Sequence, residues 1–335
     1  MIPASPRLHL LLIARSRLFL LAVVLWPVAA NPAIVSSVLK PEVWEETDTR
    51  YIRAGESIAL AYVDIGEGRP CSGGIPSFRK GSTIVHCKPW TTTREIRWYI
   101  LEPQALDYSN TESCWQRRPG CVLPIYYLFR EMDMFRGHPV IRPGMLRQYL
   151  GEGTHRIWAT TDQSVASQLR TPGKPPGIEI VVRKNDSYTG YLSELKGVPF
   201  VLLPLNAGNG VHQTDARLGA DCVALVIYGQ RRMGVSIPYV APPALKSFMK
   251  RVPVRPDGRW NISQGDVLHF GFQTAVVYED RKPYGTLNDG DLIIHTYHGR
   301  AEVVRFGDLT YRHHPYDVLR WPQKEEIGPR REVLN

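Results

Sequence analysis

The chain has 335 residues, of which 43% are hydrophobic, and a formal net charge of +9. Domains usually have roughly 100–200 residues, so this length predicts two domains with enough chain for a hydrophobic core. A small scaffold held together by disulfides alone is therefore excluded. The modest positive charge suits an anionic partner such as a cell-wall polymer or an acidic peptide. No nucleic-acid-binding motif is found, and we expect no nucleic-acid partner.

The first 30 residues have the pattern of a secretory signal peptide. Arg7, Arg15 and Arg17 precede the apolar run 18–26, and small residues at 28–30 offer a cleavage site. The alternative is an uncleaved anchor, but the apolar run is short for a bilayer span of about 20 residues. We therefore expect a secreted or periplasmic protein with no stable membrane insertion after the signal is removed.

Residues 31–130 are expected to form a β-rich domain. The segments 51–62, 82–87 and 94–101 alternate apolar and polar residues and are separated by Gly and Pro, which is typical of a small antiparallel sandwich or barrel. Four of the five cysteines lie here. We expect two local disulfides, Cys71–Cys87 and Cys114–Cys121, one of three possible pairings.

Residues 131–177 are expected to form a helical connecting region. The segment 143–150 has Pro near its start, and the segment 161–169 has Thr or Asp as a cap, so each predicts a short helix. The Pro- and Gly-rich run 171–177 predicts a boundary.

Residues 178–335 are expected to form an α+β domain, in which helices precede a series of strands. Short apolar runs predict the strands, and apolar spacing with a possible cap predicts the helices. The expected strands are 178–182, 266–270, 274–278, 292–296 and 301–306, and the expected helices are 187–195, 223–232 and 245–251.

Cys222 is the odd cysteine, and it follows Asp221 directly before the apolar helix. The N-terminus of a helix lowers the pKa of a thiol, and the thiolate is the nucleophile in cysteine hydrolases. Such an enzyme also needs an imidazole, and His269, His295 and His298 lie on or beside the later strands. The alternative is that Cys222 is a small buried hydrophobic residue.

The order of these motifs resembles the NlpC-type cell-wall peptidases of the papain-like superfamily. Asp221-Cys222-x-x-Leu225-Val226 opens a helix, Gly265-Asp266-Val267-Leu268-His269-Phe270 follows, and a hairpin strand comes next, so the resemblance covers residues 184–306. It implies a papain-like α+β fold for residues 178–335, Cys222 as the nucleophile and Asp266 as a structural acid. His295 falls where the orienting polar residue of the family lies.

The chain departs from the family at the base. Thr274 occupies the position of the catalytic His, and Thr cannot act as a general base near neutral pH. Three explanations stay open. His295 is itself the base, with Gln273 orienting it or binding the oxyanion. Alternatively, His269, His298 or His212 supplies the imidazole, or the chain has lost catalysis and only binds its ligand.

The resemblance implies an exported thiol peptidase or amidase that cleaves an amide of a peptidoglycan peptide, next to a D-glutamyl or diaminopimelyl residue. No cofactor is expected. A metal site at His295, His298 and Asp291 is not expected either, because no further ligand has a familiar spacing. The rivals are a catalytically silent wall-binding protein of the same fold and a structural exported protein.

Overall fold

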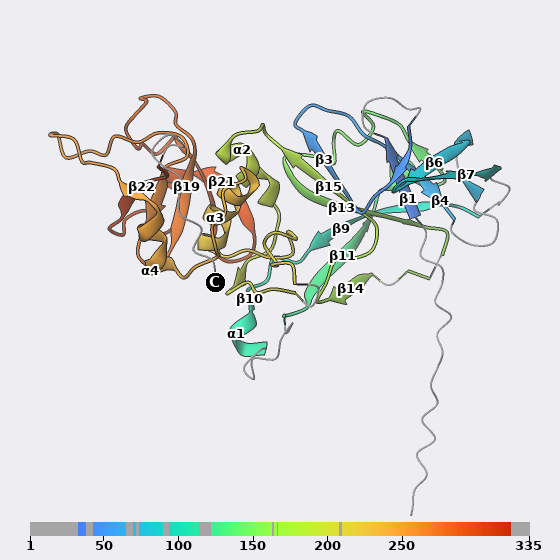
Figure 1. Cartoon of the computed structure of the whole chain (residues 1–335), viewed down its shortest axis with the longest axis horizontal. Helices are drawn as coiled ribbons and strands as arrows, with labels where there is room; N and C mark the ends of the chain where they lie inside the picture. The colour runs from blue at the N-terminus through green and yellow to red at the C-terminus, as the bar shows by residue number, and fades with distance from the viewer. Residues whose placement is uncertain are drawn as a thin grey trace, which may run out of the picture.

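The computed structural model describes residues 33–37, 43–64, 70–71, 74–89, 94–113, 122–162, 164–165, 167–207 and 210–322. The expected signal peptide 1–30 and the expected Cys114–Cys121 disulfide lie outside these residues. The described chain is α+β, mostly sheet with few helices, which confirms the expected class. In Figure 1 the strands β1, β4, β6 and β7 lie at one end of an elongated molecule, and β19, β21 and β22 lie at the other.

The first sheet has eight strands in the order β7-β6-β2-β1-β4-β5-β8, with β12 also paired to β4. Most pairs are antiparallel, but β2–β6 and β5–β8 are parallel. The disulfide Cys71–Cys87 is confirmed, and it links β5 to the residue after β7. The strands are β1 (Ala33–Ser37), β2 (Glu45–Glu46), β4 (Ala59–Val63), β5 (Pro70–Cys71), β6 (Ser77–Lys80), β7 (Thr83–His86), β8 (Lys88–Pro89) and β12 (Val140–Ile141).

The second sheet has six strands in the order β14-β11-β9-β13-β15-β3. It packs against the first sheet through a shared core in which Leu60 of β4 meets Trp98 of β9 and Ile180 of β15. Alternate residues of β4 point the other way, into a core with Trp44 and Phe78. The strands are β3 (Thr49–Arg53), β9 (Arg97–Pro103), β11 (Ile125–Glu131), β13 (Gly153–Thr160), β14 (Gln168–Thr171) and β15 (Ile178–Arg183).

The helical interpretation of residues 131–177 is wrong. Residues 143–149 form turns around the buried Leu146, and the expected second helix gives way to β14. Helical structure is limited there to the 3-10 turn η2 (Asp133–Phe135). The reason is tertiary pairing, because β13 lies between β9 and β15 in the sheet and Ile157 and Ala159 are buried in the core that these distant strands form. Strands from all three expected segments therefore share one sheet, since β15 also pairs in parallel with β3.

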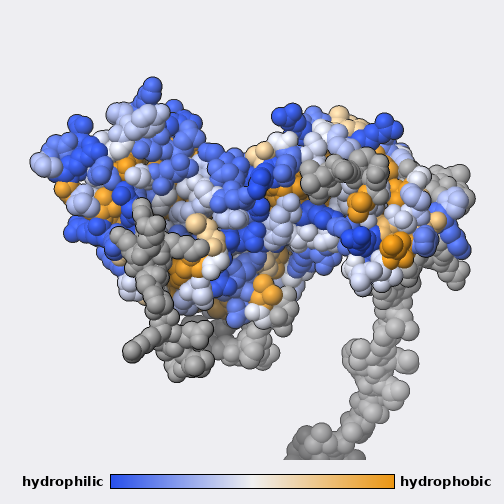
Figure 2. All heavy atoms as spheres, turned by 45° about the horizontal axis from the view of Figure 1, so that its top comes forward, coloured by the Kyte–Doolittle hydropathy of each residue, from blue (hydrophilic) through white to orange (hydrophobic). Residues whose placement is uncertain are grey.

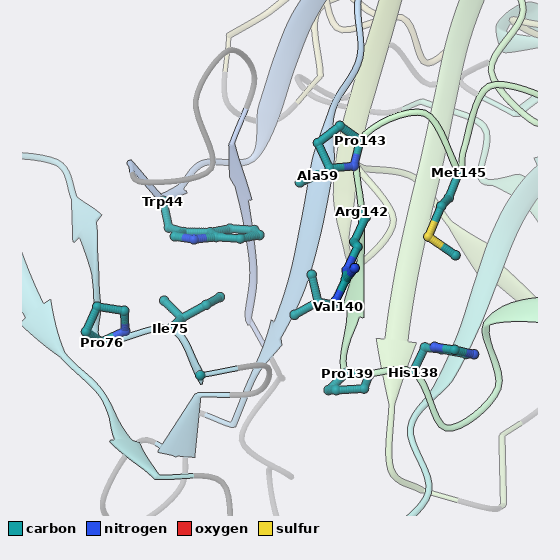
Figure 3. A pocket seen from close by; sticks show the side chains of 11 residues that line it. Trp44, Ala59, Ile75, Pro76, His138, Pro139, Val140, Arg142, Pro143 and Met145 are labelled. Atoms are coloured by element: carbon teal, nitrogen blue, oxygen red, sulfur yellow. The ribbon is translucent and has the colours of Figure 1, made fainter.

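A cavity of about 800 Å³ opens beside β4 and β12 (Figure 3). Trp44 and Ile75 lie on one side of it, and Pro139 and Val140 lie on the other. None of the residues singled out from the sequence lines this cavity.

The third sheet has six strands in the order β17-β22-β18-β19-β20-β21, and every neighbouring pair is antiparallel. The strands expected at 266–270, 274–278, 292–296 and 301–306 are confirmed within a few residues at each end. The strands are β17 (Lys250–Arg251), β18 (Val267–His269), β19 (Thr274–Glu279), β20 (Leu292–Thr296), β21 (Ala301–Arg305) and β22 (Asp317–Arg320).

In Figure 1, α2 and α3 lie in the middle of the molecule, whereas α4 (Pro242–Leu245) lies near β22 and α1 (Asn110–Ser113) lies near β10. The expected helix 223–232 is α3 (Cys222–Arg232), and the expected helix 187–195 is α2 (Tyr188–Leu192) continued by η3 (Ser193–Leu195). The basic helix expected at 245–251 begins and ends earlier, because β17 already starts at Lys250 and pairs with β22. The remaining short elements are α1 (Asn110–Ser113), α4 (Pro242–Leu245), η4 (Lys246–Phe248), η5 (Phe306–Asp308) and the parallel pair β10 (Tyr108–Ser109) and β16 (Val201–Leu202).

A buried ion cluster joins the second sheet to the loop before α3. Glu179 of β15 accepts from Arg156 of β13 at 2.7 Å and from Nε of Arg217 at 3.0 Å. Burial alone raises the pKa of Glu179, but Arg156 and Arg217 outweigh it and hold that pKa below its usual value. The two halves of the chain are thus held together by a charge network that water does not reach.

The described surface carries no long apolar helix. Among the residues given above, none of the helices has the length and hydropathy needed to cross a membrane. The face drawn in Figure 2 is largely hydrophilic, with small separate hydrophobic patches.

Candidate functional site

The candidate site begins at the first turn of α3. Asp221 is the N-cap, and its carboxylate accepts from the N–H groups of Val223 at 3.1 Å and Ala224 at 2.8 Å. Every residue of α3 from Cys222 to Gln230 is buried. The helix expected at 223–232 is therefore confirmed, and the structure adds that it begins at Cys222 and that Asp221 is its cap.

Cys222 is a free cysteine with only 7% of its surface exposed. Burial raises the pKa of its thiol to about 11, and the charge of Asp221 adds to the rise. Hydrogen bonds involving Thr274 and the Val223 backbone offset only part of it. The field of the helix N-terminus is thus opposed by its own cap, and Cys222 is a neutral thiol near pH 7.

Thr274, at the position of the family's catalytic His, lies against Cys222. It is the first residue of β19, and its hydroxyl donates to the Cys222 carbonyl at 2.7 Å. Thr274 is fully buried. The position where the resemblance calls for a basic imidazole is therefore filled by a short hydroxyl that is committed to the backbone of α3.

His295 and the strand residues that pack with Cys222 lie on different faces of the third sheet. On one face, Val276 of β19 and Ile294 of β20 share a core with Cys222. On the other face, Ala275 and Ile293 share a core with Tyr311. Side chains alternate along a strand, and Ala275 is the register partner of His295. His295 therefore lies on the Tyr311 face, and Tyr311 is near enough to Cys222 for the charge of the thiolate to raise the pKa of the Tyr311 hydroxyl.

His295 is held by Tyr311, which the sequence analysis missed. The Tyr311 hydroxyl and His295 Nδ1 are 2.9 Å apart, and His295 Nε2 lies 3.8 Å from a carboxylate oxygen of Glu302. Burial lowers the pKa of His295 to about 4, so the imidazole is neutral at pH 7. No sequence motif marked Tyr311, because it follows η5 in an irregular segment.

Gln273 is also engaged in the sheet. Its amide is buried and donates to the Thr296 carbonyl at 2.9 Å. A side-chain hydrogen bond to Gln273 also acts on the Tyr311 hydroxyl, lowering the pKa that burial raises. Gln273 therefore orients Tyr311 rather than His295 directly.

His269 lies on the same face of the sheet as α3. It is two residues from Val267, which packs in the Cys222 core, and it is the register partner of Thr274. Its Nδ1 accepts from the Gly271 N–H at 3.0 Å, so the neutral ring carries its proton on Nε2. That Nε2 is buried and has no hydrogen-bond partner in the described part of the chain. Burial lowers the pKa of His269.

The two other candidate histidines have different surroundings. His298 is an exposed turn residue with a φ of 58°, and its Nδ1 lies 2.7 Å from Asp107. His212 stacks on Tyr239 with ring centroids 3.7 Å apart, and its Nδ1 accepts from the Thr214 N–H. Burial lowers the pKa of His212 to about 4.

The acidic residues of this region have structural partners. Asp266 forms a two-pronged pair with Arg320 at 2.6 Å, as a structural acid of the first strand would. Asp291 accepts from the backbone N–H groups of Arg281 and Asn288. Within the residues that the structure describes, no group of three His, Cys, Asp or Glu is placed to hold a metal ion.

Comparisons with known proteins assign the chain to no family. Searches of protein-family models, of curated proteins and of solved structures found no match to this chain.

Proposed function

We propose that the protein is an exported, catalytically silent member of the NlpC-like, papain-like type that binds a cell-wall peptide without cleaving it. The NlpC-like placement, the wall ligand and the export rest on the sequence motifs. The observation that carries the loss of catalysis is the hydrogen bond from Thr274 to Cys222, because it fills the base position with a group that cannot take a proton.

The protonation states support the same proposal. A papain-like attack needs a thiolate and an imidazolium, but the pKa values are about 11 for Cys222 and about 4 for His295. Burial therefore disfavours proton transfer from the thiol to that imidazole, because it raises the pKa of Cys222 and lowers that of His295. The resting site therefore holds two neutral groups.

Thiol labelling and wall digestion test the proposal together. Iodoacetamide labelling of Cys222 is expected to show a midpoint near pH 11, and peptidoglycan incubated with the protein should release no new amines while the protein cosediments with it. An acidic labelling midpoint, or amine release that Cys222→Ala abolishes, would contradict the proposed loss of catalysis. Failure to cosediment would contradict binding.

A gain-of-base variant sharpens the test. Thr274→His restores an imidazole at the position beside Cys222, and a proton acceptor there is expected to lower the labelling midpoint by at least one pH unit. An unchanged midpoint in a variant with native circular dichroism would show that position 274 does not control the thiol.

The second candidate is a thiol hydrolase that uses His269. It is favoured by one observation, that His269 shares the α3 face of the sheet and is the register partner of Thr274. Antiparallel partners have Cβ atoms about 5 Å apart, so His269 could reach the groups around Thr274 if Gly271 released Nδ1. Amine release by the wild type that is lost in His269→Gln but kept in His295→Gln would establish this candidate.

A further inference from the structure

A second pocket lies at the opposite end of α3 from Cys222. Its volume is about 540 Å³, within the range of about 300–1,000 Å³ of small-molecule sites. It lies between α2, the turn before β18 and the end of β22. Gln230 is eight residues after Cys222, which corresponds to about 12 Å along a helix axis. The pocket is lined chiefly by polar side chains and two aromatic rings, among them Asn185, Tyr188, Gln230, Gln264, Arg320 and Trp321.

Gln230 and Trp321 supply polar groups to the pocket. Only 9% of the surface of Gln230 is exposed, and its side chain lines the pocket. Its amide atoms are not among the buried side-chain atoms that lack a partner in the described part of the chain, whereas Nε1 of Trp321, which lines the same pocket, is one of them. An amide that offers both a donor and an acceptor to a pocket, beside an indole N–H without a partner, is suited to a ligand that can both donate and accept hydrogen bonds.

The charged groups of the pocket cancel each other. Asp266 and Arg320 form the two-pronged pair described above, and Asp266 also accepts from the Ser263 N–H at 2.7 Å. Thr189 accepts from the Gln264 amide at 2.8 Å. The pocket therefore presents amides and hydroxyls without a net charge, which disfavours a phosphate, a carboxylate or an amine as its ligand.

Two aromatic rings form the apolar wall. Tyr188 and Trp321 meet edge to face, with centroids 6.3 Å apart. The Tyr188 hydroxyl is anchored because it donates to the Val226 carbonyl at 3.0 Å. A ring fixed as Tyr188 is offers rigid apolar surface with little further loss of side-chain entropy on binding.

We propose that this pocket binds a neutral pyranose unit of a saccharide. A sugar ring carries hydroxyls that both donate and accept, which match the amides, and C–H faces that match the two rings. The assignment extends the proposed function, because it places saccharide recognition at a site separate from Cys222, and it stands on the pocket alone.

Titration calorimetry with chitotriose, a neutral trimer of N-acetylglucosamine, tests the assignment. Gln230→Leu keeps the volume of the side chain but removes its hydrogen bonds, so we expect it to weaken binding about five- to tenfold. Gln168→Leu is the matched control, because Gln168 is exposed on β14 and far from the pocket in the chain. We expect it to leave the affinity unchanged.

The outcomes are distinct from those of the Cys222 experiments. Absence of heat at millimolar chitotriose, or equal affinity in Gln230→Leu and the wild type, would overturn the assignment. Trp321→Ala should also weaken binding, and perturbation of the Gln230 side-chain amide resonances by chitotriose provides a readout without mutation. These measurements report on the pocket at the end of α3 that is far from Cys222. The outcome of the Cys222 labelling experiment is therefore independent of them.

Discussion

His295 is a buried neutral imidazole, with 6% of its surface exposed. Its Nδ1 lies 2.9 Å from the Tyr311 hydroxyl, and its buried Nε2 lies 3.8 Å from Glu302 with no hydrogen-bond partner among the described residues. At the scale of single residues, the main consequence is a dependence of stability on pH. Protonation of this ring would place a charge where water cannot solvate it.

We expect His295 to make the protein less stable in mild acid. Its pKa falls from 6.5 in the unfolded chain to about 4 in the folded one, so the unfolded state binds the proton first as the pH decreases. Stability is therefore full above pH 6.5 and decreases as the pH falls toward 4, by up to about 3 kcal/mol. Urea unfolding at several pH values measures this loss.

The variant His295→Gln should reduce that pH dependence by the share of His295, and the rest is expected to remain because burial also lowers the pKa values of His212 and His269. Gln keeps a polar group opposite the Tyr311 hydroxyl but does not titrate. His86→Gln on the exposed face of β7 is the control and should keep the wild-type slope. An identical slope in His295→Gln and the control would mean that other groups cause the acid sensitivity.

At the scale of elements, α3 depends on one residue for two properties. Asp221 caps the helix through two backbone N–H groups, and its charge raises the pKa of the adjacent thiol. The cap stabilises the helix, whereas the charge suppresses the reactivity of Cys222. The two effects can be separated by substitution.

Asp221→Asn should keep the helix cap and lower the pKa of the Cys222 thiol. Asn caps helices as well as Asp does, so the free energy of unfolding should change by less than about 0.5 kcal/mol. The labelling midpoint of Cys222 should decrease, because a nearby negative charge is removed. Asp221→Ala should lower the midpoint as well but also cost about 1 kcal/mol of stability. Equal midpoints in all three proteins would contradict a role for the Asp221 charge.

At the scale of the whole molecule, Glu179 joins the N-terminal sheets to the α3 region, and we expect them to unfold as one unit. Arg156 and Arg217 are both buried, and Arg217 lies in the loop that leads to Cys222. Breaking a buried ion pair leaves an uncompensated charge, which costs more than the pair itself contributes. A substitution that destabilises the second sheet should therefore also destabilise α3.

Glu179→Gln is expected to destabilise the whole protein by about 3 kcal/mol. Glu46→Gln, at the exposed pair with Lys80, is the matched control and should cost about 0–1 kcal/mol. Circular dichroism would follow overall unfolding, and labelling of Cys222 would follow the opening of α3. We expect coincident midpoints. Separate transitions would show that the two halves unfold independently.

The local sequence was sufficient for much of the C-terminal part. The Asp221 cap, the apolar run of α3 and the alternating strands from Val267 to Arg305 are encoded by patterns a few residues long. The disulfide Cys71–Cys87 also closes a short loop, with a separation of 16 residues. The segment 153–160 was missed because its alternation is weak by itself, and its burial depends on the distant strands β9 and β15.

By itself, the sequence predicted a helix that begins directly after Cys222 and a later strand that contains His295. Only the tertiary structure decided which face of the sheet carries His295, that Tyr311 is the partner of His295, and that the amide of Gln230 lines a pocket. The physical reason is the distance along the chain over which each interaction acts. Helix caps and strand alternation arise between neighbouring residues, whereas the face that a strand presents to α3, and the burial that sets each pKa, depend on how distant segments pack.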